Sequence, residues 1–306
     1  MNDPDGLLSF HVAAETLPRG LQLVAGLTGF IDSGSTVEQF SDYFTDTLEG
    51  HIVAEFRADD LLDYRARRPT IYFDQDHISG YETPKLAIYL LSDDLNRPFY
   101  FLTGFEPDFR WEAFARSVRW FIEAFEVEAT TWVHAIPMPA PHTRPIGVTV
   151  SGNRRDLADT MSVWRPNTQA PANAMHIVEY SLDRANHEVV GFVLLVPHYL
   201  ADAEYPTAAV VALQSITAAT GLIFPTDRLR DEGRAFEQKI DEQVHSNEEL
   251  AALVGRLEKT YDEYMQDNSI PSPLTTEDGS IPSADSIAAE LEEFLAAQRR
   301  RDSDHE

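Results

Sequence analysis

The sequence predicts a three-layer α/β/α fold, with helices on both faces of a largely parallel sheet and an appended C-terminal helical segment. Short apolar runs of strand length recur between residues 7 and 196, and amphipathic stretches of helical length separate several of them. Strand composition then disappears after residue 226. Alternating strands and helices are typical of a parallel sheet covered by helices, so we expect about eight to ten strands in one core domain.

The predicted domain boundaries follow this change in sequence composition. We place the α/β/α core domain at residues 1–225 and a helical hairpin at 226–266. Residues 267–306 are predicted to hold an acidic linker, a short amphipathic helix that starts at Ser283, and a disordered tail.

Composition excludes several classes of function. The chain has 306 residues, of which 43% are hydrophobic, enough for a sizeable core. Its 51 acids against 24 bases give a net charge of -27, which disfavours nucleic acid and anionic membrane surfaces as partners. The absence of cysteine excludes disulfides, thiolate metal sites and a cysteine nucleophile. The start, Met1–Gly6, does not resemble a secretory signal, and no apolar stretch approaches the roughly 20 residues of a membrane span. We expect a soluble cytoplasmic protein.

The N-terminal part predicts strands at residues 7–14 and 21–25. A glycine-bearing loop, residues 26–34, leads to Ser35-Thr-Val-Glu38, a capping box that opens a helix. That loop has two interpretations. It could cradle a phosphate at the helix N-terminus, or it could be a tight turn that needs glycine for its backbone angles.

Three further strands are predicted before the centre of the chain, at residues 51–56, 70–74 and 86–91. The last two are separated by residues 76–85, which have the composition of a hairpin or longer loop. The mixed-charge residues 59–68 suggest a solvated connecting segment.

The central stretch is a βαβ unit. Residues 98–104 and 129–136 are predicted strands, and the intervening helix, residues 109–126, has an apolar face of 3.6-residue period. A proline-rich loop, Pro137–Pro145, follows the second strand. Ligands bind open α/β sheets at the carboxyl ends of the strands, so polar residues at these two points are the first candidates for a site.

The later elements continue the pattern. We predict strands at residues 146–150, 175–182 and 189–196, a helix at 154–161, and a helix from Pro206 to about Thr220. Two helices follow in residues 227–266, with Ser246-Asn-Glu-Glu249 as a capping box between them. Their narrow apolar stripes should pack against either their own domain or another subunit.

Candidate site residues each have a structural alternative. Glu106 and Asp108 could be a carboxylate pair for acid/base work or a metal, or Asp108 could cap the following helix. His134 lies in an apolar strand and is expected to be a core histidine. His142, in a proline-stiffened and accessible loop, is either a ligand-binding group or part of a subunit contact, and His198 with Tyr199 has the same two interpretations. The chain lacks the Gly-x-Ser-x-Gly, His-Glu-x-x-His and Walker patterns, and we predict neither a metal nor a cofactor.

Three motifs carry a family resemblance. They are Gly104-Phe-Glu-Pro-Asp-Phe-Arg-Trp-Glu-Ala-Phe114, Ile136-Pro-Met-Pro-Ala-Pro-His-Thr-Arg-Pro145, and Val196-Pro-His-Tyr-Leu200 with Tyr205-Pro206. Over residues 5–265 the chain resembles the proteasome assembly chaperone 2 family, in particular its actinobacterial branch. The resemblance implies a fold similar to nucleoside phosphorylases and related hydrolases, no established catalytic residue set, and a tendency to self-associate.

Two functional hypotheses follow. The first is a non-catalytic, oligomeric assembly or protein-interaction module with protein partners, in which the apolar helical stripes lie at subunit contacts. The second is a phosphorylase-like enzyme or binder of an anionic or nucleoside-type small molecule, in which Arg110 and Arg144 would clamp the ligand and His142 would be the acid/base group. The remaining residues of that pocket would be Glu106, Asp108, His198 and Tyr199.

Overall fold

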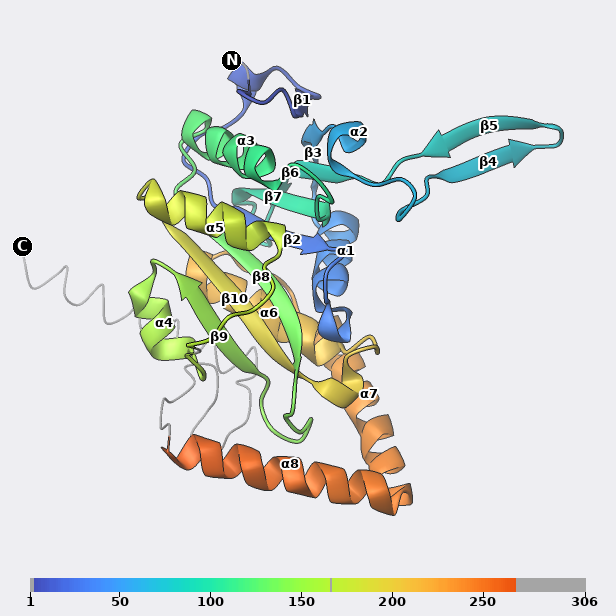
Figure 1. Cartoon of the computed structure of the whole chain (residues 1–306), viewed down its shortest axis with the longest axis vertical. Helices are drawn as coiled ribbons and strands as arrows, with labels where there is room; N and C mark the ends of the chain where they lie inside the picture. The colour runs from blue at the N-terminus through green and yellow to red at the C-terminus, as the bar shows by residue number, and fades with distance from the viewer. Residues whose placement is uncertain (1–2, 166, 268–306) are drawn as a thin grey trace, which may run out of the picture.

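Eight strands form one mixed sheet, and helices cover both of its faces (Figure 1). The computed structural model describes residues 3–165 and 167–267. The strand order is β1-β3-β6-β7-β2-β8-β10-β9. The bounds are β1 Leu8–Phe10, β2 Leu23–Thr28, β3 Gly50–Phe56, β6 Leu86–Ser92, β7 Pro98–Phe105, β8 Thr130–Met138, β9 Gly147–Gly152 and β10 Val189–Pro197.

The centre of the sheet is parallel and its margins are antiparallel. Strands β7, β2, β8 and β10 run parallel to one another, whereas β1, β3, β6 and β9 pair antiparallel with their neighbours. The predicted βαβ unit is present as β7, α3 (Trp111–Ala124) and β8, with β2 inserted between its two strands. Buried parallel strands require cover on both faces, and the helices provide it.

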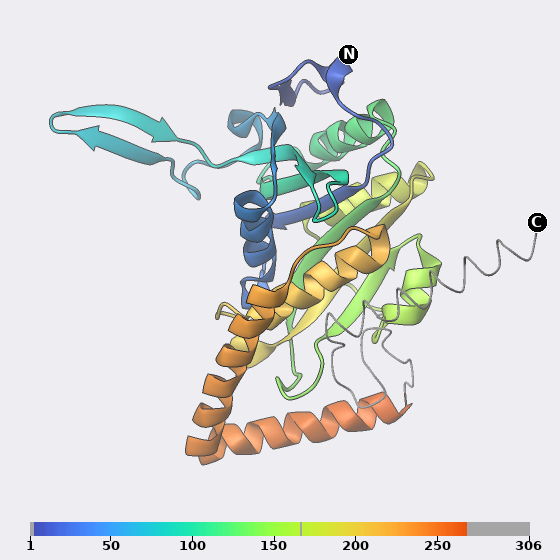
Figure 2. The same ribbon diagram turned by 180° about the vertical axis from the view of Figure 1, so that it is seen from behind.

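Two hydrophobic cores lie on opposite faces of the sheet. Helices α1 (Thr36–Thr47) and α6 (Pro206–Thr220) cover one face, over a core that includes Phe40, Phe44 and Phe101. Helices α3 and α5 (Ala174–Arg184) cover the other face, and the core there also contains several aromatic residues. Figures 1 and 2 show the two helical layers from opposite sides. The predicted three-layer fold is confirmed. The remaining short helices are η1 Ala14–Thr16, η2 Ser33–Ser35, α2 Ala58–Leu61, α4 Arg155–Met161 and η3 His198–Leu200.

The strand predicted at residues 175–182 is wrong, because this segment is helix α5. Its buried residues Met175, Val178 and Leu182 follow helical spacing. Asn173 and His176 form a capping box that fixes the helix start. Ile177, Val178 and Tyr180 favour a strand locally, but the N-terminal cap and the packing against the sheet stabilise a helix here instead.

Two helix starts are capped by residues other than those predicted. At α1 the Asp32 carboxylate accepts the Val37 and Glu38 backbone N–H groups at 2.8 and 3.0 Å, and the Ser35 side chain makes no cap bond. The helix N-terminus is thus already occupied by a carboxylate, and the tight-turn interpretation of the glycine loop holds. Between the last two helices, Asn247 provides the cap instead of Ser246.

Strands β4 (Thr70–Asp74) and β5 (His77–Glu82) form a separate two-stranded hairpin, so the segment predicted as a hairpin or loop contains a strand. The hairpin projects from the body of the molecule in Figures 1 and 2. Its strands are exposed along their whole length, apart from the half-buried Gly80.

Helices α7 (Asp227–Ser246) and α8 (Glu248–Asp267) occupy the segment predicted as a helical hairpin, and Figures 1 and 2 show them meeting at a wide angle. We call this pair of helices the α7–α8 hairpin. Phe236 and Ile240 on α7 pack against the α6 core, and Val254 and Leu257 on α8 are buried. These parts of the stripes are therefore covered by the chain itself, and subunit contacts through the rest of the stripes stay a prediction. The linker, helix and tail predicted for 267–306 lie outside the described residues except for Asp267, which ends α8. The domain boundaries stay predictions.

Candidate functional site

The first group of predicted residues lies in the turn after β7. The backbone N–H groups of Asp108 and Phe109 donate to the Leu61 carbonyl at 2.8 and 3.1 Å, so the α2 region holds this turn from outside. Leu61 and Leu62 are buried, and residues 59–68 are therefore not a purely solvated connector.

Asp108 acts as a tether between segments. Its carboxylate accepts the Asp63 backbone N–H at 2.7 Å and pairs with Arg67. Helix α3 has no side-chain cap, and its N-cap residue is Arg110, at φ 59°. The capping role expected for Asp108 is thus wrong, because the local chain turns through a left-handed residue and the carboxylate faces the α2 segment.

The Glu106 side chain is buried, and one of its carboxylate oxygens accepts a hydrogen bond. Its Oε2 accepts the Ala174 backbone N–H at the start of α5, at 2.9 Å. Burial raises the pKa of this carboxyl. Arg110, in contrast, is exposed and pairs with Asp60 at 3.2 Å. Neither geometry resembles a substrate clamp.

The second group lies beyond β8 and β10. The His142 backbone N–H donates to the Tyr199 hydroxyl at 2.7 Å, and His142 Nδ1 lies 2.7 Å from the same oxygen. The other ring nitrogen, His142 Nε2, lies 3.1 Å from Asp241 Oδ1 on α7. The histidine expected to be accessible is therefore enclosed, with 2% of its side chain exposed, because α7 covers it.

Arg144 binds helix α8. Its Nε and Nη2 donate to the two carboxylate oxygens of Asp262, each at 2.8 Å, and Nη1 donates to Glu258 at 3.3 Å. The bidentate hydrogen bond raises the pKa of Arg144 and lowers that of Asp262. An anionic ligand at Arg144 would have to displace these carboxylates.

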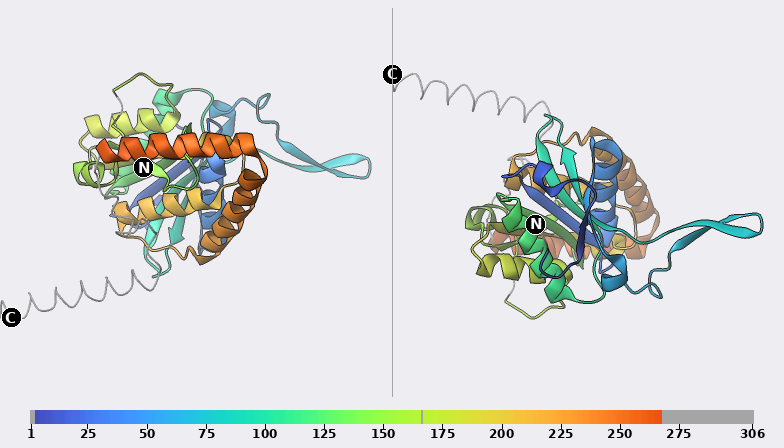
Figure 3. Two further views of the ribbon diagram at one scale, coloured as in Figure 1. Left: turned by 90° about the horizontal axis from the view of Figure 1, so that it is seen from below. Right: turned by 90° about the horizontal axis from the view of Figure 1, so that it is seen from above.

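We call the contacts of His142, Thr143 and Arg144 with α7 and α8 the latch. Thr143 Oγ1 donates to Glu258 at 2.6 Å, and Tyr261 donates its hydroxyl to the Pro145 carbonyl at 3.2 Å. Seen from below, α8 crosses the end of the molecule in Figure 3. The latch joins the proline-rich loop to a segment about a hundred residues away in sequence.

The structure joins only some of the predicted residues. His142 contacts Tyr199, and the rings of His198 and Tyr199 lie 5.5 Å apart, with His198 itself exposed. No hydrogen bond or ion pair in residues 3–165 and 167–267 links these residues to Glu106, Asp108 or Arg110. Binding of a ligand by the seven residues stays a prediction.

A family model described as the PAC2 family matches residues 26–244. The chain belongs to the PAC2 family. The match includes all three motifs of the resemblance and both groups of candidate residues, which confirms the family expected from sequence. No curated protein matches the chain.

Solved structures of related proteins agree with this assignment. A protein of unknown function from Mycobacterium tuberculosis is 36% identical, with a TM-score of 0.78 over 88% of this chain and 92% of that one. A protein of unknown function from Corynebacterium glutamicum is 31% identical, with a TM-score of 0.79 over 85% of this chain and 98% of that one. A proteasome-assembly chaperone homologue from Mycobacterium tuberculosis shares the fold at 21% identity, with a TM-score of 0.70 over 76% of this chain and 100% of that one.

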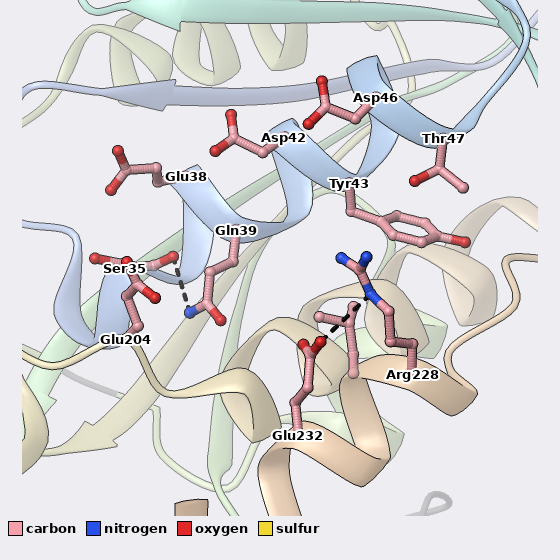
Figure 4. A pocket seen from close by; sticks show the side chains of 11 residues that line it. Ser35, Glu38, Gln39, Asp42, Tyr43, Asp46, Thr47, Glu204, Arg228 and Glu232 are labelled. Carbon is pink, nitrogen blue, oxygen red and sulfur yellow. Dashed lines mark hydrogen bonds and ion pairs between the residues drawn. The ribbon is translucent and has the colours of Figure 1, made fainter.

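This PAC2 chain also has an acidic pocket that the sequence did not indicate. Its volume is about 440 Å³, and it lies between α1 and α7 (Figure 4). Arg228 in its wall pairs with Glu232 at 3.4 Å. None of the predicted site residues lines it. Its five carboxylates belong to Glu38, Asp42, Asp46, Glu204 and Glu232.

Sequence reasoning missed the carboxylates of the latch in this PAC2 chain. Asp241, Glu258 and Asp262 are three of many acids in residues 227–306, and nothing in their spacing separates them from solvent-facing ones. The available signal was charge complementarity between the acidic helices and a loop that carries His142 and Arg144.

Within the described ranges, no cluster of three or more histidines and carboxylates could hold a metal, and no helix is long and apolar enough to span a membrane.

Proposed function

We propose that this chain is a bacterial homologue of the proteasome assembly chaperones and acts as a non-catalytic, oligomeric module for protein interaction in the cytoplasm. The observation that carries the proposal is the uncovered apolar face of the β4–β5 hairpin. Membership of the PAC2 family and the fold shared with a proteasome-assembly chaperone homologue support the class of function.

The hairpin has one apolar and one mainly polar face. Ile71 pairs with Tyr81 and Phe73 pairs with Ile78, and residues directly opposite each other in antiparallel strands point to the same side. A register irregularity beside Phe73 leaves Ser79 unpaired, which keeps Ile78 and Tyr81 on one face. Phe73 and Tyr81 are 69% and 68% exposed. Four large apolar side chains thus form one continuous face.

Such a face needs a partner. A two-stranded hairpin is marginally stable by itself in water, and contiguous exposed apolar surface marks an interaction site. Each of these side chains contributes about 1.5–3 kcal/mol when it becomes fully buried. A second copy of the chain is our proposed partner, because the molecule offers a second exposed apolar set at the carboxyl ends of the adjacent strands β2 and β7. This set consists of Ile31, Phe105 and Phe109.

Light scattering of the full chain tests this proposal. We expect a homo-oligomer at micromolar concentration, and we expect the double variant Phe73→Ser with Tyr81→Ser to be monomeric with an unchanged circular dichroism spectrum. Tyr180→Ser is the matched control, because Tyr180 is 65% exposed on α5, away from the hairpin, and its loss should leave the oligomer intact. A strictly monomeric wild-type chain, or an oligomer that survives the double variant, would refute the proposal.

A further inference from the structure

The tip of the β4–β5 hairpin is acidic. Asp74 ends β4, and Asp76 lies in the turn that joins the two strands. Asp74 is exposed, and the Asp76 side chain is 96% exposed, with the ring of its neighbour His77 at 3.3 Å. Figure 2 shows the tip as the part of the hairpin farthest from the body of the molecule. Two carboxylates therefore lie at the outer end of the apolar face.

The root of the hairpin is basic. We define the root as residues 65–69, which lead into β4, and residues 83–85, which follow β5. Its exposed bases, which form no ion pair in the part of the chain that the structure describes, are Arg65, Arg68 and Lys85. The carboxylates nearby are already bonded: Asp60 to Arg110, Asp108 to Arg67, Glu82 to the Tyr72 hydroxyl, and Asp63 to the Arg65 backbone N–H. In a chain with a net charge of -27, three unpaired bases at one place are conspicuous.

The root adjoins the second apolar set. The Phe105 backbone N–H donates to the Lys85 carbonyl at 3.2 Å, and the Arg67 guanidinium carbon lies 5.2 Å from the centre of the Phe105 ring. Both legs of the hairpin thus contact a member of the set that we propose to receive the hairpin of a second copy. A hairpin docked on this set comes close to the bases of the root.

The two charged ends cannot neutralise each other within one copy. Arg68 and Asp74 are six residues of nearly extended chain apart, roughly 20 Å at about 3.3 Å per residue. Electrostatic interactions between exposed charges are largely screened beyond about 8 Å at physiological salt. The complement of each end must therefore come from another molecule, and a second copy offers both charges.

We infer that the acidic tip of the β4–β5 hairpin in one copy pairs with the basic root of a second copy, so that charge fixes the orientation in which the hairpin docks. This inference rests on the self-association proposed above and adds which ends meet. A tip that meets a tip, or a root that meets a root, brings like charges together, and this opposes binding far more than exposed ion pairs favour it. The apolar residues supply most of the affinity, and the charges exclude the wrong orientations.

Charge reversal tests the pairing in the full chain. The tip variant is Asp74→Lys with Asp76→Lys, and the root variant is Arg65→Glu with Arg68→Glu. Each variant alone places like charges at the contact, so its Kd for self-association should rise at least about 100-fold in sedimentation velocity. In an equal mixture, the reversed tip meets the reversed root, and the native root meets the native tip. The mixture should associate with a Kd within about threefold of the wild-type value.

Two controls separate charge pairing from other effects. The neutral variant Asp74→Asn with Asp76→Asn removes only attraction, so it should remain oligomeric, with a Kd raised about tenfold at most. Arg155→Glu with Arg256→Glu changes the net charge as much as the root variant does, at exposed arginines on α4 and α8. It should keep the wild-type Kd.

The outcomes distinguish this inference from the function on which it rests. A wild-type chain that stays monomeric would refute the self-association, and the pairing with it. A wild-type oligomer whose tip and root variants self-associate with an unchanged Kd would overturn the pairing alone, as would two variants that stay monomeric when mixed.

Discussion

The chain carries two peripheral hairpins, one of strands and one of helices, and they relate to the core in opposite ways. The β4–β5 hairpin extends outward with its apolar face uncovered. The α7–α8 hairpin lies against the core, packed through Phe236 and Ile240 and joined by the latch. Both are additions to the three-layer core, but only the helical one has buried large apolar residues, among them Val254 and Leu257.

This difference shows where self-association should be sought. The apolar stripes of the C-terminal helices looked like the natural subunit contact, because helices with acidic backs must pack on something. In the structure, α7 packs on the core under α6, and α8 is bonded to the proline-rich loop. The two most exposed large apolar side chains in the described residues, Phe73 and Tyr81, belong instead to a short hairpin that is inconspicuous in sequence.

The largest effect on the helical hairpin is expected from Gly233→Leu. A Cβ atom at Gly233 would lie 2.6 Å from Thr207 Oγ1 and 3.3 Å from the Thr207 backbone nitrogen, so a side chain there forces α7 away from α6. Overpacking of this kind costs about 1–3 kcal/mol, or a fall of several degrees in Tm, measured by thermal unfolding.

The control for this variant is Gly255→Leu. No atom lies within 4 Å of a Cβ at Gly255 on α8, and leucine is the better helix former by roughly 0.5–1 kcal/mol. Its Tm should stay unchanged or rise. Equal losses of stability for the two variants would mean that α7 does not depend on this close approach.

A smaller and more local effect is expected from Arg144→Met. The substitution keeps the length of the side chain but removes the bonds to Asp262 and Glu258, so α8 should open more often while the sheet stays intact. Hydrogen exchange in residues 248–264 should accelerate several-fold, without change in β7, β2, β8 and β10.

Arg110→Met is the matched control, because Arg110 is exposed and its ion pair with Asp60 involves neither helix. It should leave exchange in α8 unaltered. If Arg144→Met also left it unaltered, the apolar contacts of Val254 and Leu257 would suffice to hold the helix, and the latch would have no energetic role.

The fold was largely predictable because its signals are local. The apolar face of α3 repeats at 3.6 residues, and β10 is a continuous apolar run, so each element could be recognised within its own window. Helix α5 could not, since Ile177, Val178 and Tyr180 favour a strand locally and only the Asn173 cap and the packing of Met175 and Leu182 select the helix.

The surroundings of the candidate site were not predictable, because they depend on tertiary contacts. The proline-rich loop was recognised as a place of interest, but its histidine is enclosed by Asp241, 99 residues away in sequence. The position of Asp108 just before a helix predicts a capping role. Its partners are instead Asp63 and Arg67, which come from an earlier segment of the chain. His134 was expected to be a core histidine, and it is buried as expected, but spacing cannot reveal that its Nε2 lacks a partner in the described part of the chain.

The smallest effect is expected when the pH is lowered. It should distinguish the α7–α8 hairpin, which depends on an ion pair, from the β4–β5 hairpin, whose exposed face is apolar. Arg144 lowers the pKa of Asp262 below its unfolded value of about 3.9. A carboxyl with a lowered folded pKa contributes stability above the unfolded pKa and loses it as the pH falls through the folded pKa. Below about pH 3.9, the amide hydrogens of α8 should therefore exchange faster, and Arg144→Met should lack this acid dependence.

The four apolar residues of the β4–β5 face carry no charge, so oligomerisation through them should not follow the same titration. An oligomer that dissociates in step with the opening of α8 would show that the two hairpins are coupled, contrary to the independence inferred from their contacts.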